Sequence, residues 1–329
     1  MIKIKICDMF AEGACSFYRG IGSMSMLHKL DSEISVDVIQ NVSWNSLIDA
    51  DILYLIRPTT PEYIRAIEYA QSFGIKVWSD YDDALHLIPD YNPSYNYHTD
   101  PGVKKRTEAA INNSDIVTVS TQIIADCYWN LNPDIKIVEN AFNDYHYKFE
   151  RKKYINKNIV WRGTETHRED VLQIKDQITN VMNKNSDWNF IYIGENLWYI
   201  VNKFKNKNYY YQKTLDIVKY LRFIYNLNPS VAIIPLLKNY FNYAKSNCSW
   251  IEATFSGATC LAPDLPEFQK PGIVNYSTPE KFEYFLEKIM TSKNFCNENY
   301  EKSFDYIKNN LMLSEINKKR IKIIRDALK

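Results

Sequence analysis

Residues 231–267 read VAIIPLLKNYFNYAKSNCSWIEATFSGATCLAPDLPE, and this stretch decides the fold class. Its pattern predicts a strand over Val231–Pro235, a loop, a helix over Ala244–Phe255 and a second strand over Thr259–Ala262. Gly257 suits the left-handed turn that ends a helix. The sequence therefore predicts a unit in which a helix connects two parallel strands.

The same alternation of strands and helices extends through the first 150 residues. Strands are predicted at Ile2–Cys7, Val36–Gln40, Asp51–Arg57, Lys76–Asp80, Asp115–Ser120 and Asp134–Asn140, with helices at Pro61–Phe73 and Thr121–Leu131. The run DILYLIR is almost continuously apolar, which is typical of a parallel strand covered by helices on both faces. We therefore predict a doubly wound α/β domain.

A polar, charged stretch over residues 146–157 has no periodicity and is the expected linker. After it the alternation restarts, with further strands at Asn158–Gly163 and Asn189–Gly194 and further helices at Arg168–Met182, Val218–Leu227 and Pro279–Met290. We predict two Rossmann-like domains, 1–150 and 151–312, that face each other across a cleft. A final amphipathic helix, 313–329, is expected to return to the N-terminal domain. Ligands of open α/β sheets bind beyond the carboxyl ends of the strands, so functional residues should follow the strands directly.

Composition excludes several classes of protein. The chain has 329 residues, 46% hydrophobic residues, 9 Gly and 12 Pro, so it is neither disordered nor collagen-like. No apolar run reaches the length of a membrane span, and the six Cys residues have no metal-ligand spacing. We expect reduced thiols and a cytoplasmic protein. With 40 basic and 39 acidic residues, the net charge of +1 does not favour a phosphate backbone as the main partner, although a local basic patch would suffice.

The predicted helix after Val231–Pro235 carries the features of a diphosphate site. Its first turn contains Lys245, Ser246 and Asn247. A helix N-terminus offers free N–H groups and a partial positive charge, to which the lysine adds a full one. Glu252 lies two turns further on, where a carboxylate is suited to bind ribose hydroxyls. The alternative is an amphipathic surface helix with a solvated Lys and Glu.

The stretch FNYAKSNCSWIEATFSGATCLAPD resembles the donor-binding segment of GT-B glycosyltransferases of the group-one or family-four type. That family has a Glu-x7-Glu motif that closes with Glu-Ala-x-x-x-Gly, which Glu252, Ala253 and Gly257 match. The first Glu of the motif would fall at position 244, which is Ala in this chain. The contact that this Glu makes with the sugar in the resembled family is therefore not expected here. The variant is similar to a divergent branch found in phage and bacterial gene clusters. The resemblance implies a nucleotide-sugar donor (UDP- or GDP-sugar), no required metal and retention of anomeric configuration. It also implies donor contacts from Asn242, Ser246, Asn247, Cys248 and Glu252.

A second segment, NIVWRGTETHRED (158–170), reads as a strand, a Gly turn and the start of a helix. Arg162 and the amides around Gly163 and Thr164 are suited to hold phosphate. The resemblance extends to this segment and places a basic residue on the donor diphosphate. His167, a further donor-site candidate, shares a helix face with Asp170, and the alternative is that the two form a capping pair that orders the turn.

Two further segments follow predicted strands in the N-terminal domain. KVWSDYDDALHLIP (76–89) places Asp80, Asp82 and Asp83 after a strand end, where carboxylates bind metal, accept from sugar hydroxyls or act as a base. The alternative role is capping of a loop or helix. Directly after the first strand, Gly13 and Ala14 permit close backbone approach, as in the Gly-rich first loop of the resembled family, and Arg19 is a charged candidate at the cleft.

These segments predict a glycosyltransferase in which Asp82, Asp83, Arg162 and Lys245 are the catalytic residues. The positive groups would stabilise the departing nucleoside diphosphate in place of a metal ion. For the acceptor, the sequence favours a hydroxymethylated base in phage DNA, with basic clusters at 151–153, 203–207 and 318–325 along the DNA backbone. The alternatives are a surface glycan, a lipid-linked sugar or a protein side chain. A nucleotide- or sugar-binding module without activity is the remaining class.

Overall fold

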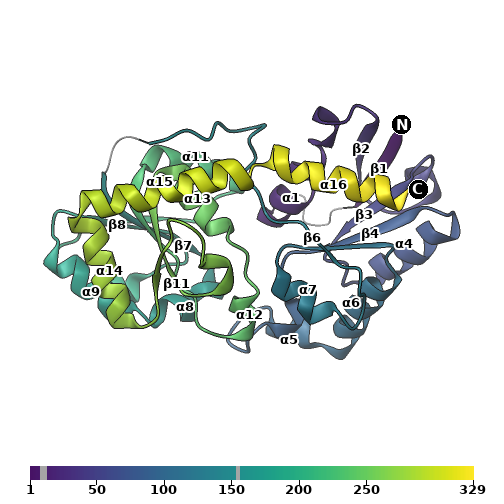
Figure 1. The fold of residues 1–329 in the computed structure, drawn as a ribbon. Coiled ribbons are helices and arrows are strands. Elements are labelled where there is room, and N and C mark those ends of the chain that lie inside the picture. The colour runs from purple at the N-terminus through teal and green to yellow at the C-terminus, as the bar shows by residue number, and fades with distance from the viewer. Residues whose placement is uncertain (8–12, 153–155) are drawn as a thin grey trace.

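A computed structural model describes residues 1–7, 13–152 and 156–329. The chain folds into two lobes, each built around a parallel six-stranded sheet with helices on its faces (Figure 1). Part of the predicted first loop, residues 8–12, and part of the predicted linker, residues 153–155, lie outside the described residues.

The N-terminal sheet has the strand order β2-β1-β3-β4-β5-β6. Its strands are β1 (Ile2–Cys7), β2 (Ile34–Ile39), β3 (Ile52–Ile56), β4 (Lys76–Tyr81), β5 (Ile116–Val119) and β6 (Lys136–Ile137). The connecting helices are α1 (Ala14–Arg19), α2 (Ile21–Met24), η1 (Leu27–Lys29), α3 (Trp44–Leu47), α4 (Pro61–Ser72), η2 (Leu85–Leu87), α5 (Tyr95–Thr99), α6 (Pro101–Asn113) and α7 (Gln122–Tyr128). Strand β3 is buried at every position, as its apolar sequence predicts.

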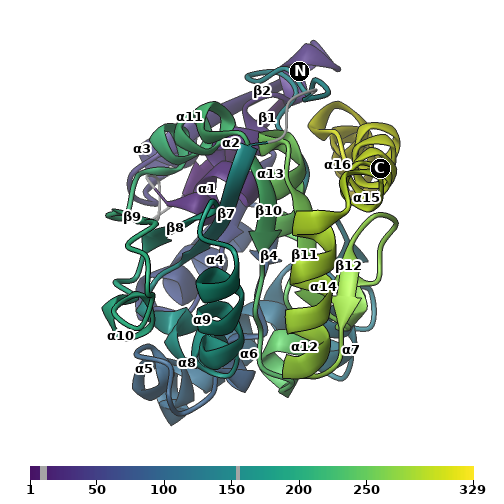
Figure 2. The same ribbon diagram turned by 90° about the vertical axis from the view of Figure 1, so that its left-hand side faces the viewer.

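The C-terminal sheet has the order β12-β11-β10-β7-β8-β9. Its strands are β7 (Asn156–Gly163), β8 (Asn189–Gly194), β9 (Tyr209–Gln212), β10 (Pro229–Ile233), β11 (Thr259–Pro263) and β12 (Val274–Tyr276). Its helices are η3 (Glu165–His167), α8 (Arg168–Leu172), α9 (Lys175–Lys184), α10 (Trp198–Val201), α11 (Ile217–Leu227), α12 (Tyr240–Tyr243), α13 (Cys248–Ser256), η4 (Pro266–Phe268), α14 (Pro279–Thr291) and α15 (Lys293–Asn310). Figure 2 shows this lobe from its outer side, with α9 and α14 in front of the sheet.

Each sheet reverses its direction of winding at one point. In the N-terminal sheet the chain passes from β1 to β2 on one side and then continues with β3 on the other. In the C-terminal sheet β7 is flanked by β8 on one side and by β10 on the other. The reversal leaves a crevice at the carboxyl ends of the two strands, because the connections on either side lead away from it. The crevices between β1 and β3 and between β7 and β10 are therefore the expected ligand sites.

The final helix, α16 (Leu313–Ala327), returns to the N-terminal lobe as predicted, and Figure 1 shows α15 and α16 extending across both lobes. Two chain crossings lie side by side, because Phe142 N–H donates to the Leu311 carbonyl at 2.8 Å and Leu313 N–H donates to the Phe142 carbonyl at 2.8 Å. Ile324 is fully buried in the same apolar cluster as β1 and β3. The predicted domain boundary at residue 150 lies in this connection and stays a prediction.

Two predicted helices have different bounds. The predicted helix 168–182 is divided into α8 and α9, because Gln173 turns out of the first and its side chain donates to the Asp170 carbonyl at 2.9 Å. The helix predicted to begin at Ala244 begins at Cys248. Asn239 caps the short α12, and Asn247 precedes α13; asparagine favours such positions over helix interiors because its side chain competes for backbone hydrogen bonds. The predicted strand 134–140 is reduced to β6.

Candidate active site between the two sheets

A cavity of about 350 Å³ lies where the two crevices meet. Residues after β1, β3 and β4 line it from the N-terminal lobe, and the ends of β7 and β10, the segments that follow them and α13 line it from the C-terminal lobe. Among the lining residues are three cationic side chains and three carboxylates, namely Arg57, Arg162, Lys245, Asp82, Asp83 and Glu252. The volume falls within the range of small-molecule sites, and the charged groups converge from both lobes.

The N-terminus of α13 opens into this cavity without a side-chain cap. Asn247 occupies the cap position, but its side chain makes no capping hydrogen bond and instead donates to Glu267 Oε2 at 3.3 Å. Ser246, Cys248 and Ser249 line the cavity around the helix end. The first N–H groups of a helix have no partner within the helix, so an uncapped end favours an anion.

The prediction that Lys245, Ser246 and Asn247 form the first turn of the helix is therefore wrong, since they precede it. Asn247 lines a separate groove behind the helix end rather than the cavity. Lys245 and Ser246 do line the cavity, from the turn before α13.

Arg162, at the end of β7, and Glu252, on α13, form an ion pair in the cavity wall. Arg162 Nη2 lies 2.7 Å from Glu252 Oε2 and donates to Ser249 Oγ at 2.9 Å. The Glu252 side chain is 3% exposed, whereas that of Arg162 is 35% exposed. Two tyrosines complete the carboxylate's partners: Tyr18 Oη donates to Oε1 at 2.8 Å and Tyr220 Oη donates to Oε2 at 3.2 Å.

Burial and the Glu252 charge change the acidity of the groups around this pair. Burial alone would lower the pKa of the Arg162 guanidinium, but Glu252 raises it above its ordinary value. Burial, and then the Glu252 charge, raises the pKa of both Tyr18 and Tyr220, and raises the pKa of Cys248 to about 12. At neutral pH the Arg162 guanidinium is therefore charged and the hydroxyl and thiol groups around it are neutral, so these groups act as hydrogen-bonding groups rather than nucleophilic anions.

A second charged cluster faces this pair from the N-terminal lobe. Arg57, directly after β3, donates from Nε to Asp82 and from Nη2 to Asp83 at 2.9 Å. Lys245 Nζ reaches across from the C-terminal lobe to Asp83 Oδ1 at 3.0 Å. Burial alone would raise the pKa of the Asp82 carboxyl, but Arg57 lowers it below its ordinary value. Asp82 is thus a charged acceptor at the cavity, and Asp83 beside it accepts from both Arg57 and Lys245.

Solved structures with the same architecture were found over the whole chain. Anabaena HepE in complex with UDP-glucose matches with a TM-score of 0.71 and 8% identity, over 99% of this chain and 100% of HepE. A glycosyltransferase of Rickettsia africae matches with a TM-score of 0.67 and 11% identity, over 100% of this chain and 98% of that one. A protein of Listeria monocytogenes assigned as a UDP-N-acetylglucosamine 2-epimerase matches with a TM-score of 0.61 and 11% identity, over 98% and 95%.

The chain has the GT-B fold.

This chain spans about half the length of TarM, which it matches with a TM-score of 0.61 and 13% identity over 83% of its own residues and 54% of TarM. No protein-family model matches the sequence, and a search of curated protein sequences finds no match. The likeness to other GT-B structures is therefore one of fold.

Around the buried Asp170, side chains of the second predicted segment hold one wall of the GT-B cleft in shape. Asp170 is 2% exposed and accepts from His167 Nδ1 at 2.8 Å, from the Leu237 N–H at 2.7 Å and from Asn242 Nδ2 at 2.9 Å. Asn242 is also buried and does not line the cavity, whereas His167 does. The alternative interpretation of His167 and Asp170, a pair that orders the turn, fits these contacts.

Arg19 is the clearest correction. It was expected at the cleft, but it is fully buried beneath it and pairs with Asp80, which is itself 1% exposed. Ala14 lines the cavity, whereas Gly13 is the cap residue of α1. Gly163 does not line the cavity either.

Packing explains the glycine at position 163. A Cβ there would lie 2.7 Å from the Trp161 ring and 3.0 Å from the His167 Cβ. The hydroxyl of Thr164 pairs with that of Thr166 at 2.8 Å and is not among the lining groups.

Ala244, which stands where the resembled family has its first Glu, is 1% exposed and packs against the N-terminal lobe. Its carbonyl accepts from Thr121 Oγ1 at 3.1 Å. Phe241 enters the same apolar cluster, and the Lys245 ammonium lies 4.3 Å from the centre of its ring. Position 244 is thus a buried contact between the two lobes. A Glu there would bury an unpaired charge, which is why a small apolar residue fits this position.

Sequence reasoning missed several lining residues: Cys15, Tyr18, Arg57, Asn140, Tyr220 and Ser249. Arg57 carried a usable signal, because it ends the run DILYLIR at a strand terminus. Its φ of +45° is a left-handed conformation uncommon for arginine, and such outliers gather at functional sites. Tyr18 and Tyr220 carried none, since tyrosine abounds in this chain and their meeting at Glu252 depends on both lobes.

In residues 1–7, 13–152 and 156–329, no group of three or more His, Cys, Asp or Glu side chains is placed to hold a metal ion. No helix in that part of the chain combines the length and apolar character that a membrane crossing requires.

Proposed function

We propose that this chain is a glycosyltransferase that moves a sugar from a UDP-sugar donor to an acceptor hydroxyl. The observation that carries the proposal is the cavity at both topological switch points, where the uncapped end of α13, Arg162, Glu252 and Lys245 face Asp82 and Asp83. The HepE complex with UDP-glucose, on a chain of the same fold and length, supports UDP as the nucleotide.

In this mechanism the donor diphosphate binds at the N-terminus of α13. The free N–H groups there and the Arg162 guanidinium neutralise the charge that grows as UDP departs. Glu252 takes the ribose hydroxyls, which are the only strong donors on the nucleotide's sugar. Because Arg162 and Glu252 pair with each other at 2.7 Å, each exchanges this partner for a group of the donor when the nucleotide enters.

The acceptor enters from the N-terminal lobe, where Asp82 and Asp83 are held as charged acceptors by Arg57. Lys245 links Asp83 to the donor side and stabilises the leaving phosphate when it is released from Asp83. We propose, from the family resemblance, that the anomeric configuration is retained and that no metal is required. Turnover that survives EDTA supports this scheme, and loss of turnover with EDTA redirects attention to Asp80, Asp82 and Asp83 as metal ligands.

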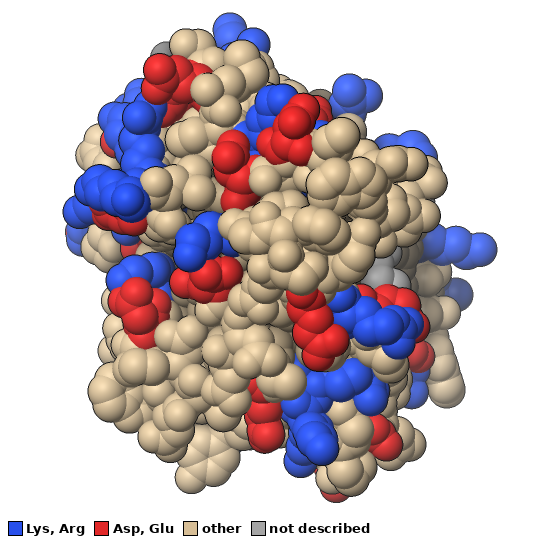
Figure 3. Space-filling view, turned by 90° about the vertical axis from the view of Figure 1, so that its right-hand side faces the viewer, with Lys and Arg blue, Asp and Glu red and all other residues tan. Residues whose placement is uncertain are grey.

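The hydroxymethylated DNA base stays the acceptor prediction to be tested first, but several basic side chains in two of the clusters offered for it are paired with carboxylates. Arg151 pairs with Glu301 at 2.5 Å, Lys319 with Glu139 at 2.7 Å and Arg325 with Asp31 at 2.6 Å. Figure 3 shows basic and acidic side chains interspersed on the outer face of the N-terminal lobe. This surface favours the alternative, a surface glycan, lipid-linked sugar or protein hydroxyl, because a DNA backbone needs uncompensated positive charge.

The test is incubation of the protein with radiolabelled UDP-glucose or UDP-N-acetylglucosamine, with and without acceptors. The expected result is slow UDP release without acceptor and faster release with the correct one, either hydroxymethylated DNA or a glycan. GDP-sugars are run in parallel to establish the nucleotide.

Three outcomes contradict the proposal in different ways. UDP binding without release identifies a binding module without activity. Conversion of UDP-N-acetylglucosamine to its 2-epimer identifies an epimerase, the activity assigned to the Listeria protein of the same fold. Absence of any UDP binding refutes a nucleotide-sugar site altogether.

A further inference from the structure

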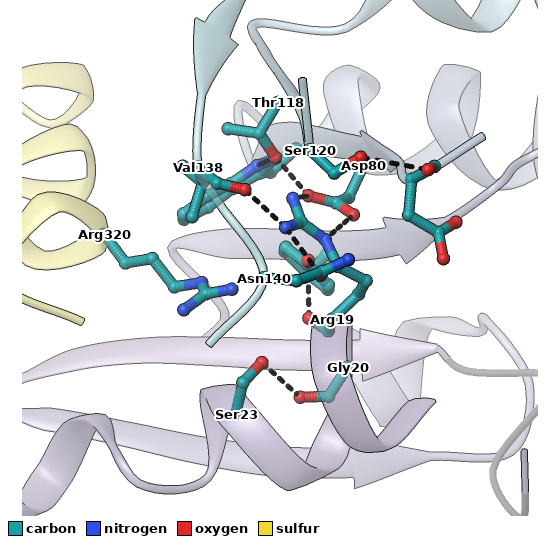
Figure 4. Close-up of polar contacts among 12 residues, drawn as sticks. Arg19, Gly20, Ser23, Asp80, Thr118, Ser120, Val138, Asn140 and Arg320 are labelled. Atoms are coloured by element: carbon teal, nitrogen blue, oxygen red, sulfur yellow. Dashed lines mark hydrogen bonds and ion pairs between the residues drawn. The ribbon is translucent and has the colours of Figure 1, made fainter. Parts of the chain in front are cut away.

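The buried Arg19 connects the core of the N-terminal lobe to the cavity. Its guanidinium donates from Nε to Asp80 Oδ1 at 2.8 Å and from Nη2 to Asp80 Oδ2 at 2.7 Å. Nη1 donates to the Val138 carbonyl and to Asn140 Oδ1, the latter at 3.2 Å. Figure 4 shows Arg19 enclosed between Asp80 on one side and Val138 and Asn140 on the other. Arg19 is thus fixed and cannot rotate without losing these bonds.

This arrangement dictates how the Asn140 amide is oriented. A guanidinium has five N–H donors and no acceptor, so the atom that faces it has to be the amide oxygen. The amide nitrogen then faces the other way, where it donates to Ser246 Oγ at 2.8 Å across the lobe interface. Asn140 is 4% exposed, and its side chain is held at both ends.

The direction of that bond determines what Ser246 can do. A hydroxyl has one proton, and here its oxygen is already the acceptor, so the proton is available to a second partner. Ser246 lines the cavity beside the uncapped end of α13. The neighbouring Cys248 is a neutral thiol and hence a weak acceptor. A phosphate oxygen at the N-terminus of α13 is a far better acceptor for the Ser246 hydroxyl.

We propose that Asn140 is a positioning residue for the donor diphosphate: held by Arg19, it donates to Ser246 and thereby directs the Ser246 hydroxyl proton to a phosphate oxygen. The inference rests on the proposed nucleotide-sugar site. Asn140 belongs to the N-terminal lobe and Ser246 to the C-terminal lobe, so the bond forms only when the lobes are together. Phosphate recognition and lobe closure are thereby coupled through one side chain.

The experiment measures binding of UDP and of uridine by calorimetry in four proteins: wild type, Asn140→Ala, Ser246→Ala and the double variant. Asn140→Ala should weaken UDP binding about 3- to 10-fold, the scale of one neutral hydrogen bond, and leave uridine binding unchanged because uridine has no phosphate. In the Ser246→Ala background the same replacement should have no further effect. A purely structural role would weaken both ligands and would add to the Ser246→Ala loss.

Two further variants guard the result against misfolding. Asn140→Asp keeps the acceptor for Arg19 but reverses the bond to Ser246, so UDP binding should fall by more than in Asn140→Ala while uridine binding holds. Asn143→Ala is the matched control, since Asn143 is equally buried but its amide donates within its own lobe, to the Gly22 carbonyl at 2.9 Å. It should bind UDP like the wild type.

The possible failures are distinguishable. If the wild type does not bind UDP, the proposed function falls, and this inference with it. If the wild type binds UDP, and both Asn140→Ala and Asn140→Asp bind UDP with the affinity of the wild type, the inference alone is refuted. Equal losses for UDP and uridine refute it too.

Discussion

One arginine–carboxylate pair in each lobe, Arg19–Asp80 and Arg162–Glu252, has a tyrosine hydroxyl bonded to it, and the two pairs differ in what surrounds them. In the N-terminal lobe Arg19 and Asp80 have side chains 0% and 2% exposed, and Tyr54 Oη donates to the Arg19 carbonyl at 2.8 Å. In the C-terminal lobe Arg162 is 35% exposed beside a buried Glu252, and Tyr18 donates to the carboxylate.

The difference separates a pair that holds the fold from a pair that can release a partner. Arg19 is surrounded by protein groups that all accept from it, so a ligand has no route to either charge. Arg162 borders a cavity, so a phosphate can replace Glu252 as its partner while water and protein relax around it. Under the proposed function, the same two functional groups serve stability in one lobe and recognition in the other.

The largest effect should come from breaking the enclosed pair. Arg19→Ala leaves the Asp80 charge buried without its partner, and we expect the free energy of unfolding to fall by about 3–5 kcal/mol. Urea denaturation measures this loss. Lys318→Ala is the control, because it removes an exposed pair with Glu315 and should cost less than about 1 kcal/mol. Similar values for the two variants would show that the enclosed pair does not hold the fold.

Breaking the cavity pair from the cationic side should affect turnover more than folding. Arg162→Ala and Lys245→Ala should each lower turnover about 10²–10³-fold, the scale for one preorganised charge at the leaving group. Lys245→Arg should not restore it, since a planar fork does not replace a point charge. Arg151→Ala, which removes an exposed arginine in the lobe connection, should keep wild-type turnover. If Lys245→Ala turns over at nearly the wild-type rate, Lys245 has no role at the leaving group and only links the two lobes through Asp83.

Breaking the pair from the acidic side should affect nucleotide affinity. Glu252→Gln should weaken UDP binding by about 1–3 kcal/mol through loss of a charged hydrogen bond to ribose. Binding of inorganic pyrophosphate, which has no ribose, should not weaken, and calorimetry with both ligands makes the distinction. Because Glu252 is 3% exposed and has three partners, the free energy of unfolding of this variant should also fall. Replacement of a carboxylate on the surface would not have this effect. Unchanged UDP affinity in the folded variant would reject the ribose role.

The smallest effect compares the two tyrosines. If ribose replaces the Tyr18 hydroxyl on Glu252, Tyr18→Phe removes a competitor and should tighten UDP binding by about 2- to 10-fold, the equivalent of one neutral hydrogen bond. Tyr54→Phe should lower stability by a similar free energy and leave UDP affinity unchanged. Weaker UDP binding by Tyr18→Phe would show that the hydroxyl supports the site rather than occupies it.

The fold was predictable because parallel strands buried on both faces leave a strong local signal. The runs at 2–7, 51–57 and 189–194 became β1, β3 and β8 within a residue at each end. Short edge strands were missed: β9 (YYYQ) is half exposed and reads as a polar loop. Sequence spacing also cannot place a helix start among several asparagines, which is why α13 begins four residues later than predicted.

The candidate site was predictable only in part. Lys245, Arg162, Glu252, Asp82 and Asp83 do converge on one cavity, because Arg162 lies at the end of β7, Asp82 and Asp83 follow β4, and Lys245 and Glu252 lie just before and on α13. Which charges face each other was not predictable, since every ion pair between the lobes joins residues far apart in sequence. Arg19 shows the limit most clearly: a charged residue after the first strand reads the same whether it faces a ligand or a buried aspartate.

The return of α16 has a consequence for how the protein is made. The first lobe lacks one of its own core residues, Ile324, until residues 1–324 have all left the ribosome. Until then the apolar surface around Ile4 and Trp78 has no cover, so the lobe that is synthesised first is completed last. The second lobe, contiguous in sequence over β7–β12, can close around its own core earlier. Nascent chains stalled before residue 313 should therefore need chaperone protection of the first half more than of the second.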